Sequence, residues 1–478
     1  MRRLLSLYSW RYPITLVYML QSTEYQALPY LRWFWQTNDF SRIMYRRHLE
    51  PTKAARMLLL ALRVGMLLQA MAGLVLLALW FLADWRGGLA FGLALLIFTP
   101  VLWAHLLVVP LVLGRIFIVG PQQRRQIAAS KHMFAKFEGT KIAIVGSYGK
   151  TSMKELLVTV LGEGLQIKAT PANKNVSISH ARFAQTLTGK EDVIVIEYGE
   201  AEPGDVARFA NITTPNCAII TGVAAAHLDK YKTVHNAGAD IFSVASVVSA
   251  DSVFVNAESP ETTPFTKPEF KKYSQHGVLG WKVSDIRVNI DGTSFAMRRK
   301  DETLELHSKL LGRHQVGPLV LVAALAKEFG LTHEQIHRGI AKTQPFEHRM
   351  QPYQLAGAWV IDDTYNGNLE GIRAGTQLLK ELSGKRKLYV TPGLVDQGAG
   401  TAHIHREMGK LIAAAKPDIV VLIQHSVTDY IKQGLHEAGY RGQLIINDDP
   451  LDFYHNLSVF IAKDDVVLLQ NDWPDNYA

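Results

Sequence analysis

Residues 141–163, KIAIVGSYGKTSMKELLVTVLGE, decide the fold of this chain. Residues 142–145 are apolar without alternation, which is typical of a strand buried on both faces of a sheet. From Met153 onward the apolar side chains recur at helical spacing, so a helix with one buried face is expected. The loop 146–152 joins the two. A strand, a glycine-containing loop and a helix in this order predict an α/β domain built on a parallel sheet.

The loop GSYGKTS has the composition of a phosphate-binding loop. Gly146 and Gly149 let backbone N–H groups approach a polyphosphate at the positive start of the helix. Lys150 adds charge at the outer phosphates, and the Thr151 hydroxyl is suited to Mg²⁺. Ile144 stands where the longer form of this motif has its first glycine, so a glycine turn with a surface lysine is the alternative. The predicted phosphate-binding residues are Gly146, Ser147, Gly149, Lys150, Thr151 and Ser152.

Composition indicates that one part of the chain is unusually apolar. The 478 residues suggest roughly two to four domains, and 48% of them are hydrophobic despite a net charge of +8. The single cysteine, Cys217, excludes a disulfide framework and cysteine metal clusters and fits a reducing compartment. Residues 1–56 hold nine Arg or Lys against three acidic residues, interleaved with aromatic residues. This mixture favours an anionic membrane surface over nucleic acid as the partner.

Two uncharged apolar stretches predict a transmembrane helical hairpin. Residues 64–82 and 89–114 can each span about 30 Å of hydrocarbon, and residues 84–88 form the turn between them. A pair of buried core helices is the alternative. Basic residues flank the hairpin on both sides and place both ends in the cytoplasm. These residues are Arg42, Arg46, Arg47, Lys53 and Arg56 before it and Arg115, Arg124, Arg125 and Lys131 after it.

Strands and helices alternate after a linker, which predicts a parallel α/β sheet. The strand 193–196 ends at Glu197, and the next apolar strand, 217–220, is followed by His227. Ligands of open α/β sheets bind beyond the carboxyl ends of the strands, so Glu197 and His227 should gather near Lys150. A helix-start carboxylate and a surface histidine are the alternatives. The predicted metal ligands are Thr151, Glu197 and His227.

The rest of the chain predicts an appendage and a second α/β domain. Residues 260–311 consist of short alternating pieces typical of a small antiparallel sheet. Five apolar strands at 359–361, 387–390, 419–423, 444–446 and 466–469 then alternate with helical patterns, as in a Rossmann-like, doubly wound domain. The first of them ends in the polar cluster 362–368, DDTYNGN. A capped helix start is the alternative interpretation of this cluster.

Residues 138–478 resemble the Mur ligase family, and within it the muramoyl-tripeptide D-alanyl-D-alanine ligase branch. Six motifs in order carry the resemblance. The loop 146–152 resembles the family's phosphate loop, 170–175 its T-x-G-N-x-N segment, 197–199 its E-x-G, 221–227 its T-N-x-x-x-x-H, 312–315 its G-x-H-N and 362–368 its D-D-S-Y-N-A-N. Arg349 resembles the arginine that reaches ATP at the join to the last domain.

The resemblance implies an ATP-dependent, ADP-forming ligase of cell-wall precursors. Such an enzyme activates a carboxylate as an acyl phosphate and joins it to the amine of an amino acid or dipeptide. The implied catalytic residues are Lys150, Glu197, His227 and Arg349, and the implied further nucleotide-binding residues are Asn173, His314, Arg349, Asp363 and Asn366. ATP and Mg²⁺ are the implied cofactors. The partners would be a small-molecule or lipid-linked precursor and the inner membrane, with catalytic domains in the cytoplasm and no nucleic acid.

Several departures from the family pattern leave alternatives open. Gly238 stands where the branch has a carbamylated lysine, so one metal ion instead of two is possible there. Gln315 and Pro318 replace asparagines, and Leu369 replaces a proline. The hairpin occupies the place of the family's UDP-binding domain. A nucleotide-binding membrane scaffold or switch without ligase activity, or a folylpolyglutamate-synthase-like ligase, are the other interpretations.

The expected organisation follows from these boundaries. A basic aromatic segment at 1–56 precedes the hairpin at 57–120 and a linker at 121–137. The central ATP-binding domain is expected at 138–345 and the C-terminal domain at 346–478.

Overall fold

A computed structural model describes every residue except 1, 24, 42, 44–48, 84, 172–174, 226, 366, 395–396, 398–399 and 472–478. Arg42, Arg46 and Arg47 of the predicted basic flank therefore lie outside the described residues. The chain divides into two compact units, whose principal spans are Met1–Arg125 and Gln126–Pro474. Each unit is described by itself.

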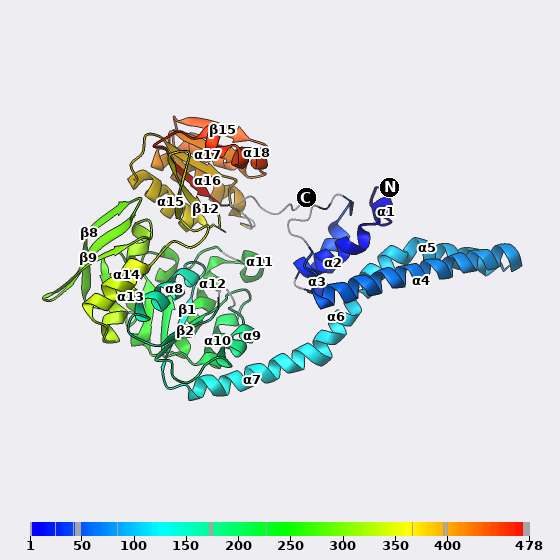
Figure 1. The fold of residues 1–478 in the computed structure, drawn as a ribbon, viewed down its shortest axis with the longest axis horizontal. Coiled ribbons are helices and arrows are strands. Elements are labelled where there is room, and N and C mark those ends of the chain that lie inside the picture. The colour runs from blue at the N-terminus through cyan, green and yellow to red at the C-terminus, as the bar shows by residue number, and fades with distance from the viewer. Residues whose placement is uncertain are drawn as a thin grey trace. The chain divides into compact units, whose positions relative to one another are not determined.

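The first unit contains the predicted pair of apolar helices. Helices α4 (Lys53–Ala83) and α5 (Arg86–Leu106) lie alongside each other (Figure 1). They approach closely where glycines leave room, and Gly73 packs against Leu96. The short helices α1 (Arg2–Ser6), α2 (Tyr12–Ser22) and α3 (Ala27–Gln36) form an aromatic cluster with parts of this pair. After α5 the chain continues through α6 (Val108–Gly114), the π-helical turn η1 (Arg115–Val119) and α7 (Gly120–Lys136).

Side chains of the preceding segment donate hydrogen bonds to α5 around Pro100. Pro100 has no N–H, so the carbonyl of Leu96 one turn earlier loses its helical donor. The Tyr8 hydroxyl lies 3.2 Å from the Leu96 oxygen and 2.7 Å from the Ile97 oxygen, and it donates to this part of the helix instead. The Tyr12 hydroxyl donates to the oxygen of Pro100 itself at 3.0 Å. The aromatic residues before the hairpin thus satisfy backbone groups around the break.

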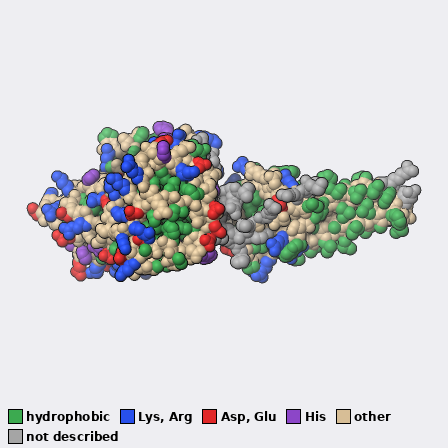
Figure 2. All heavy atoms as spheres, turned by 90° about the horizontal axis from the view of Figure 1, so that it is seen from above, with side chains coloured by type: hydrophobic (Ala, Val, Ile, Leu, Met, Phe, Trp, Pro, Cys, Tyr) green, Lys and Arg blue, Asp and Glu red, His purple; other side chains and the backbone are tan. Residues whose placement is uncertain are grey.

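Most of the hairpin's apolar side chains face outward (Figure 2). Leu67 is 62% exposed and Leu74 is 58% exposed, for example. Two helical segments, Lys53–Ala83 and Gly87–Lys136, are long and apolar enough to cross a membrane, which by itself is weak evidence of a membrane span. The second segment also shows that the predicted linker 121–137 is helical, as α7.

The second unit begins with a six-stranded parallel sheet in the order β2-β3-β1-β4-β5-β6. Its strands are β1 (Thr140–Val145), β2 (Ile167–Ala169), β3 (Val193–Glu197), β4 (Cys217–Ile220), β5 (Val253–Asn256) and β6 (Lys271–Tyr273). Helices α8 (Lys150–Leu161), α13 (Val316–Glu328) and α14 (His333–Lys342) share one core with this sheet, and α9 (Ser177–Ala184), α10 (Asp205–Thr213) and α12 (Val234–Phe242) share another. The three strands predicted here are confirmed.

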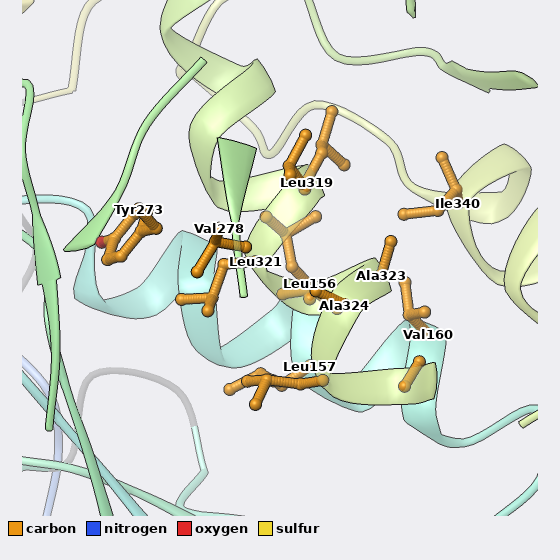
Figure 3. Packing of buried hydrophobic residues seen from close by; sticks show 14 of the residues in the cluster. Leu156, Leu157, Val160, Tyr273, Val278, Leu319, Leu321, Ala323, Ala324 and Ile340 are labelled. Atoms are coloured by element: carbon orange, nitrogen blue, oxygen red, sulfur yellow. The ribbon is translucent and has the colours of Figure 1, made fainter. Parts of the chain in front are cut away.

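The burial of both faces of strand β1 explains why residues 142–145 do not alternate between apolar and polar. Ile142 and Ile144 enter one apolar cluster, whereas Ala143 and Val145 enter the cluster on the opposite face. Both faces are covered by helices, which accounts for the unbroken apolar run at residues 142–145. On the first face, Leu156 and Leu157 of α8 pack among residues of α13 and α14 (Figure 3).

The predicted antiparallel appendage is a four-stranded sheet in the order β10-β9-β8-β7. Its strands are β7 (Gly277–Val278), β8 (Trp281–Asn289), β9 (Gly292–Arg299) and β10 (Glu302–Ser308). This part also contains the helix α11 (Leu228–Tyr231). Its short 3₁₀ turns are η2 (Ser243–Ser246), η3 (Ala250–Ser252), η4 (Pro260–Phe265) and η5 (Arg313–Gln315).

The C-terminal part is a second sheet in the order β11-β12-β16-β13-β14-β15, in which β11 alone is antiparallel to its neighbour. The strands are β11 (Gln351–Leu355), β12 (Ala358–Asp363), β13 (Lys387–Thr391), β14 (Ile419–Ile423), β15 (Gln443–Asn447) and β16 (Val466–Gln470). The helices are α15 (Leu369–Glu381), α16 (Thr401–Ala415), α17 (Thr428–Glu437), α18 (Pro450–His455) and α19 (Leu457–Phe460). All five strands predicted here are present.

Gly238 lies in α12 with its Cα against an aromatic ring. A Cβ atom at this position would meet Cε2 of Phe265 at 2.3 Å, which is far inside van der Waals contact. Phe265 also stacks on Phe242, with ring centroids 5.3 Å apart, so it is held in place. The space that a side chain at 238 would need is therefore filled by the η4 segment.

We predict that Gly238→Lys destabilises the protein, because the ring of Phe265 must move to admit the new side chain. The expected loss is about 1–3 kcal/mol in the free energy of unfolding, as for other overpacked sites. Ala239→Lys is the matched control, since Ala239 is the next residue of the same helix and is exposed. Urea titrations of both variants measure the difference, and equal stability of the two would contradict the packing argument.

Candidate functional site

The loop between β1 and α8 packs against the loop that follows β4. Gly146 has φ 149° and Gly149 has φ 72°, conformations that favour glycine. A Cβ on Gly146 would lie 2.3 Å from Oγ1 of Thr221, so the loop could not pack there with a larger residue. The Ser147 N–H donates to the Gly222 oxygen at 2.9 Å, and the Thr221 hydroxyl donates to the Tyr148 oxygen. Ser152 lies in the first turn of α8.

Tyr148 fills the space beside this loop. Its ring would collide with a Cβ on Gly222, and burial raises its pKa to about 12. Glu370, at the start of α15, adds to this rise, so the C-terminal sheet domain reaches the neighbourhood of the phosphate loop. The sequence pattern did not single out Tyr148, because the position between the two glycines is variable in such loops.

Lys150 is paired with a carboxylate that the sequence analysis missed. Its ammonium nitrogen lies 2.7 Å from Oε2 of Glu200, and it also donates to the Gly146 oxygen. Glu200 is 5% exposed, and burial raises its pKa while Lys150 partly offsets that rise. Glu200 follows Glu197 by three residues at the exit of β3, so a second acidic residue at a strand end was the available signal.

Glu197 lies directly under the start of α8. Its Oε1 accepts from the Thr151 hydroxyl at 3.0 Å, and its Oε2 lies 3.2 Å from the ammonium of Lys154, which is fully buried. The His180 imidazole donates from Nε2 to the Glu197 backbone oxygen at 2.8 Å, and the Thr170 hydroxyl accepts from the Glu197 N–H at 3.1 Å. Both the backbone and the carboxylate of Glu197 are therefore fixed.

His227, the third predicted metal ligand, lies at the start of the short helix α11. It is exposed and has a positive φ of 50°, and its carbonyl starts the short helix α11. A positive charge on His227 would lower the pKa of Glu200, so the two side chains lie near each other. Within the described part of the chain, no three His, Cys, Asp or Glu side chains form a potential metal site. The structure brings Thr151 and Glu197 together, and the predicted metal site of Thr151, Glu197 and His227 stays a prediction.

The residues at the phosphate loop nevertheless fit Mg²⁺. This ion prefers oxygen ligands and is usually held by one or two carboxylates, substrate phosphates and water. The Thr151 hydroxyl and the Glu197 carboxylate offer two such oxygens within 3.0 Å of each other. In addition, Oε2 of Glu197 is buried and makes no hydrogen bond with the described residues, although Lys154 neutralises it. Thr151 and Glu197 would hold the ion at the outer phosphates.

A second group of predicted residues lies where the central domain joins the C-terminal sheet. The guanidinium carbon of Arg349 lies 4.2 Å from the ring centroid of Tyr365, which orients it by a cation–π contact. Asp363 accepts from the Met350 N–H at 3.2 Å and from the Gln470 amide at 2.8 Å. Burial raises the pKa of Asp363 to about 7. Asp363 thus supports the loop of Arg349 from inside the domain.

His314 lies at the other side of this join, in η5. Its Nε2 lies 2.8 Å from the side-chain nitrogen of Gln315, and burial lowers its pKa to about 4, so it is neutral at pH 7. The neighbouring Arg313 donates to Glu381 of α15 at 2.7 Å, which ties the central domain to the C-terminal one. Asn173 and Asn366, the remaining predicted nucleotide contacts, lie outside the described residues.

Two family models match this chain. The Mur ligase middle domain matches residues 144–326, and the Mur ligase glutamate ligase domain matches residues 348–470. Together they cover more than half of the chain and contain the phosphate loop, Glu197, His314 and Arg349. The chain belongs to the Mur ligase family.

The relatives point to one branch of the Mur ligases. The UDP-N-acetylmuramoyl-tripeptide–D-alanyl-D-alanine ligase of Escherichia coli K12 is 28% identical over 311 residues, which are 62% of this chain and 68% of that protein. The crystal structure of MurF from Acinetobacter baumannii has a TM-score of 0.64 at 19% identity and covers 73% of this chain and 77% of that one. MurF from Thermotoga maritima in complex with ADP has a TM-score of 0.63 at 19% identity, with 73% and 80% covered. These structures establish the shared fold.

The family assignment confirms the predicted resemblance, the α/β fold and the cofactors ATP and Mg²⁺. It also confirms an ATP-dependent ligase as the class of enzyme, and it favours neither the scaffold nor the folylpolyglutamate alternative. The predicted location as a multi-pass protein of the inner membrane is wrong by this comparison. Two apolar helices are weak evidence of a membrane span and do not establish a multi-pass membrane protein.

The buried Asp363 predicts a specific pH dependence of stability. Its pKa rises from an ordinary value of 3.8 to about 7 on folding, so between these values the folded state binds more protons than the unfolded state. The free energy of unfolding should therefore fall as pH rises from about 4 to about 7, by up to about 4 kcal/mol from this group. Asp363→Asn should remove that fall, as measured by urea unfolding across the range. Asp429→Asn, at an 80% exposed side chain, should retain it, and a fall unchanged in Asp363→Asn would disprove the assignment.

Proposed function

We propose that this Mur ligase joins the carboxylate of a peptidoglycan precursor to the amine of an amino acid or dipeptide, with ATP converted to ADP and phosphate. The observation that carries the proposal is the fixed arrangement of Lys150, Thr151 and Glu197 around the phosphate loop. The relatives' names support a muramoyl tripeptide as the carboxylate substrate and D-alanyl-D-alanine as the amine.

The chemistry requires two anions to meet. A precursor carboxylate oxygen attacks the γ-phosphorus, the bond to ADP breaks, and an acyl phosphate results. Lys150 offsets the negative charge of the phosphates, and this electrostatic role is the largest contribution that such sites make. ATP supplies the phosphoryl group and Mg²⁺ neutralises charge when both are bound. Glu197, fixed by His180 and Thr170, keeps the acceptor side of the loop in one geometry.

We assign the second step, attack of the amine on the acyl phosphate, to the place where the central domain joins the C-terminal domain. The amine nitrogen attacks the acyl carbon and loses a proton. The bond between this carbon and the bridging oxygen breaks, and phosphate leaves. Arg349, stacked on Tyr365, places a positive charge from the C-terminal part where it can offset phosphate charge. Near this loop, Asn471 is 3% exposed, and its side-chain amide makes no hydrogen bond with the described residues. Such an amide is suited to a peptide substrate, which carries both donors and acceptors.

This proposal includes the domain boundaries at 138–345 and 346–478. It also includes the site residues Asn173, His227, His314 and Asn366. His314 would contact the base of the nucleotide as a neutral imidazole. His227 would join the acceptor side only with a ligand present, since it is exposed without one.

The hairpin lies outside both matched regions, and we propose lipid as the partner of its apolar surface. The length of α4 and α5, their outward leucines and the aromatic cluster at their base support a lipid contact. This contact would bring the ligase close to a lipid-linked form of the precursor and raise its local concentration.

The ligase activity has a direct test. Purified protein given ATP, Mg²⁺, UDP-muramoyl tripeptide and D-alanyl-D-alanine should release ADP only when both substrates are present. Lys150→Ala should lower this rate at least about 100-fold, since it removes charge that stabilises the transition state. Lys190→Ala, at an exposed lysine, should leave the rate unchanged. Nucleotide binding without turnover for any carboxylate and amine would instead indicate the switch function.

The lipid contact is tested by flotation with vesicles of phosphatidylcholine and phosphatidylglycerol. The full chain should float with the vesicles, and the double variant Leu67→Lys, Leu74→Lys should not, because each lysine costs about 2.5–3.5 kcal/mol in hydrocarbon. Val459→Lys changes an apolar residue that is 83% exposed on the other unit and should float normally. Self-association without flotation would show that a second copy covers this surface.

A further inference from the structure

Glu200 presents a buried negative charge beside the phosphate loop. It is 5% exposed, and the ammonium of Lys150 lies 2.7 Å from its Oε2. A carboxylate in such a position must be paired with a cation, because a buried unpaired charge is strongly destabilising. Lys150 provides that cation in the structure described here.

The other nearby cations are already engaged. Lys154 lies 3.2 Å from Oε2 of Glu197, and Lys230 lies 2.6 Å from Oε1 of Glu202. His227 acts on Glu200 electrostatically but is exposed. Glu200 therefore depends on Lys150 for its neutralisation.

Nucleotide binding changes this balance. Lys150 is the lysine of the phosphate loop, and polyphosphate oxygens at the start of α8 compete with Glu200 for its ammonium group. Once the phosphates hold Lys150, the Glu200 carboxylate is left next to further negative charge. Glu200 then needs a proton or another cation to offset its charge.

A divalent cation suits this role. Glu197 lies at the same strand exit as Glu200, and its Oε2 makes no hydrogen bond with the described residues, although the ammonium of Lys154 lies 3.2 Å away. The neighbouring helix α12 cannot supply an acidic side chain from position 238, because Phe265 fills that space. Mg²⁺ accepts carboxylate and phosphate oxygens together.

We propose that Glu200 releases Lys150 when the nucleoside triphosphate binds and then serves, with Glu197, as a carboxylate ligand of the divalent cation at the phosphates. This role rests on the proposed function insofar as the site must bind a nucleotide. It makes Glu200 an exchangeable partner, which pairs with lysine in the empty site and with metal in the occupied one.

The proposal predicts opposite effects of one substitution with and without metal. In Glu200→Gln, a non-hydrolysable ATP analogue should bind more tightly than to the wild type when EDTA is present, because Lys150 is no longer held by a carboxylate. The strengthening of binding by Mg²⁺ should fall at least about 10-fold, since loss of groups around a metal typically costs that much affinity. Isothermal titration calorimetry of the full chain, with and without Mg²⁺, measures both effects without turnover.

Glu202→Gln is the matched control, because Glu202 lies two residues further on, is 62% exposed and pairs with Lys230. It should bind the analogue as the wild type does in both conditions. Equal weakening of Glu200→Gln with and without Mg²⁺ would indicate a merely structural residue and would overturn the proposal, as would an undiminished Mg²⁺ effect. Failure of the wild type to bind the analogue at all would instead refute the nucleotide site itself. Thermal unfolding of each variant checks that folding is intact.

Discussion

The compensation of negative charge at the carboxyl edge of the central sheet is the constraint on which the functional part of this structure depends. Glu197 and Glu200 are both nearly fully buried there, and each has its own lysine from α8, Lys154 and Lys150. Two charged pairs of this kind are expensive to bury and become strongly destabilising when one member is lost. The strand–loop–helix unit is therefore organised as much by these pairs as by its apolar core. Under the proposed exchange, a polyphosphate that binds here takes Lys150 from Glu200.

Much of the fold could be predicted because burial on both faces leaves a plain signal in the sequence. Strand β1 is apolar throughout residues 142–145, since Ile144 and Val145 face different cores. The same logic identified the five strands of the C-terminal domain. Residues 121–137 are predicted only as a linker, whereas Gly120–Lys136 form helix α7, and residues such as Gln126 and Ala128 are compatible with a helix. Propensity alone could have corrected that prediction.

The parts of the site that could not be predicted depend on contacts between distant residues. The pair of Lys150 and Glu200 joins positions 50 residues apart, and the bond from Gln470 to Asp363 joins positions 107 apart. Phe265 fills the space beside Gly238 from a different segment, so the glycine could be recognised as a departure but its cause could not. Motifs identified which residues are chemically suited to the site. Their neutralising partners are fixed only by the packing of the whole domain.

Two buried carboxyl groups among these residues, Glu200 and Asp363, are stabilised in different ways. Glu200 has a lysine within 2.7 Å, whereas Asp363 is held mainly by neutral donors, Gln470 and the Met350 N–H. Burial accordingly raises the pKa of Asp363 to about 7, so a substantial share of its population is protonated near neutral pH. The C-terminal side then carries less negative charge, while Arg349 on Tyr365 contributes a full positive charge. The C-terminal side therefore carries less negative charge than the acidic sequence DD at positions 362–363 suggests.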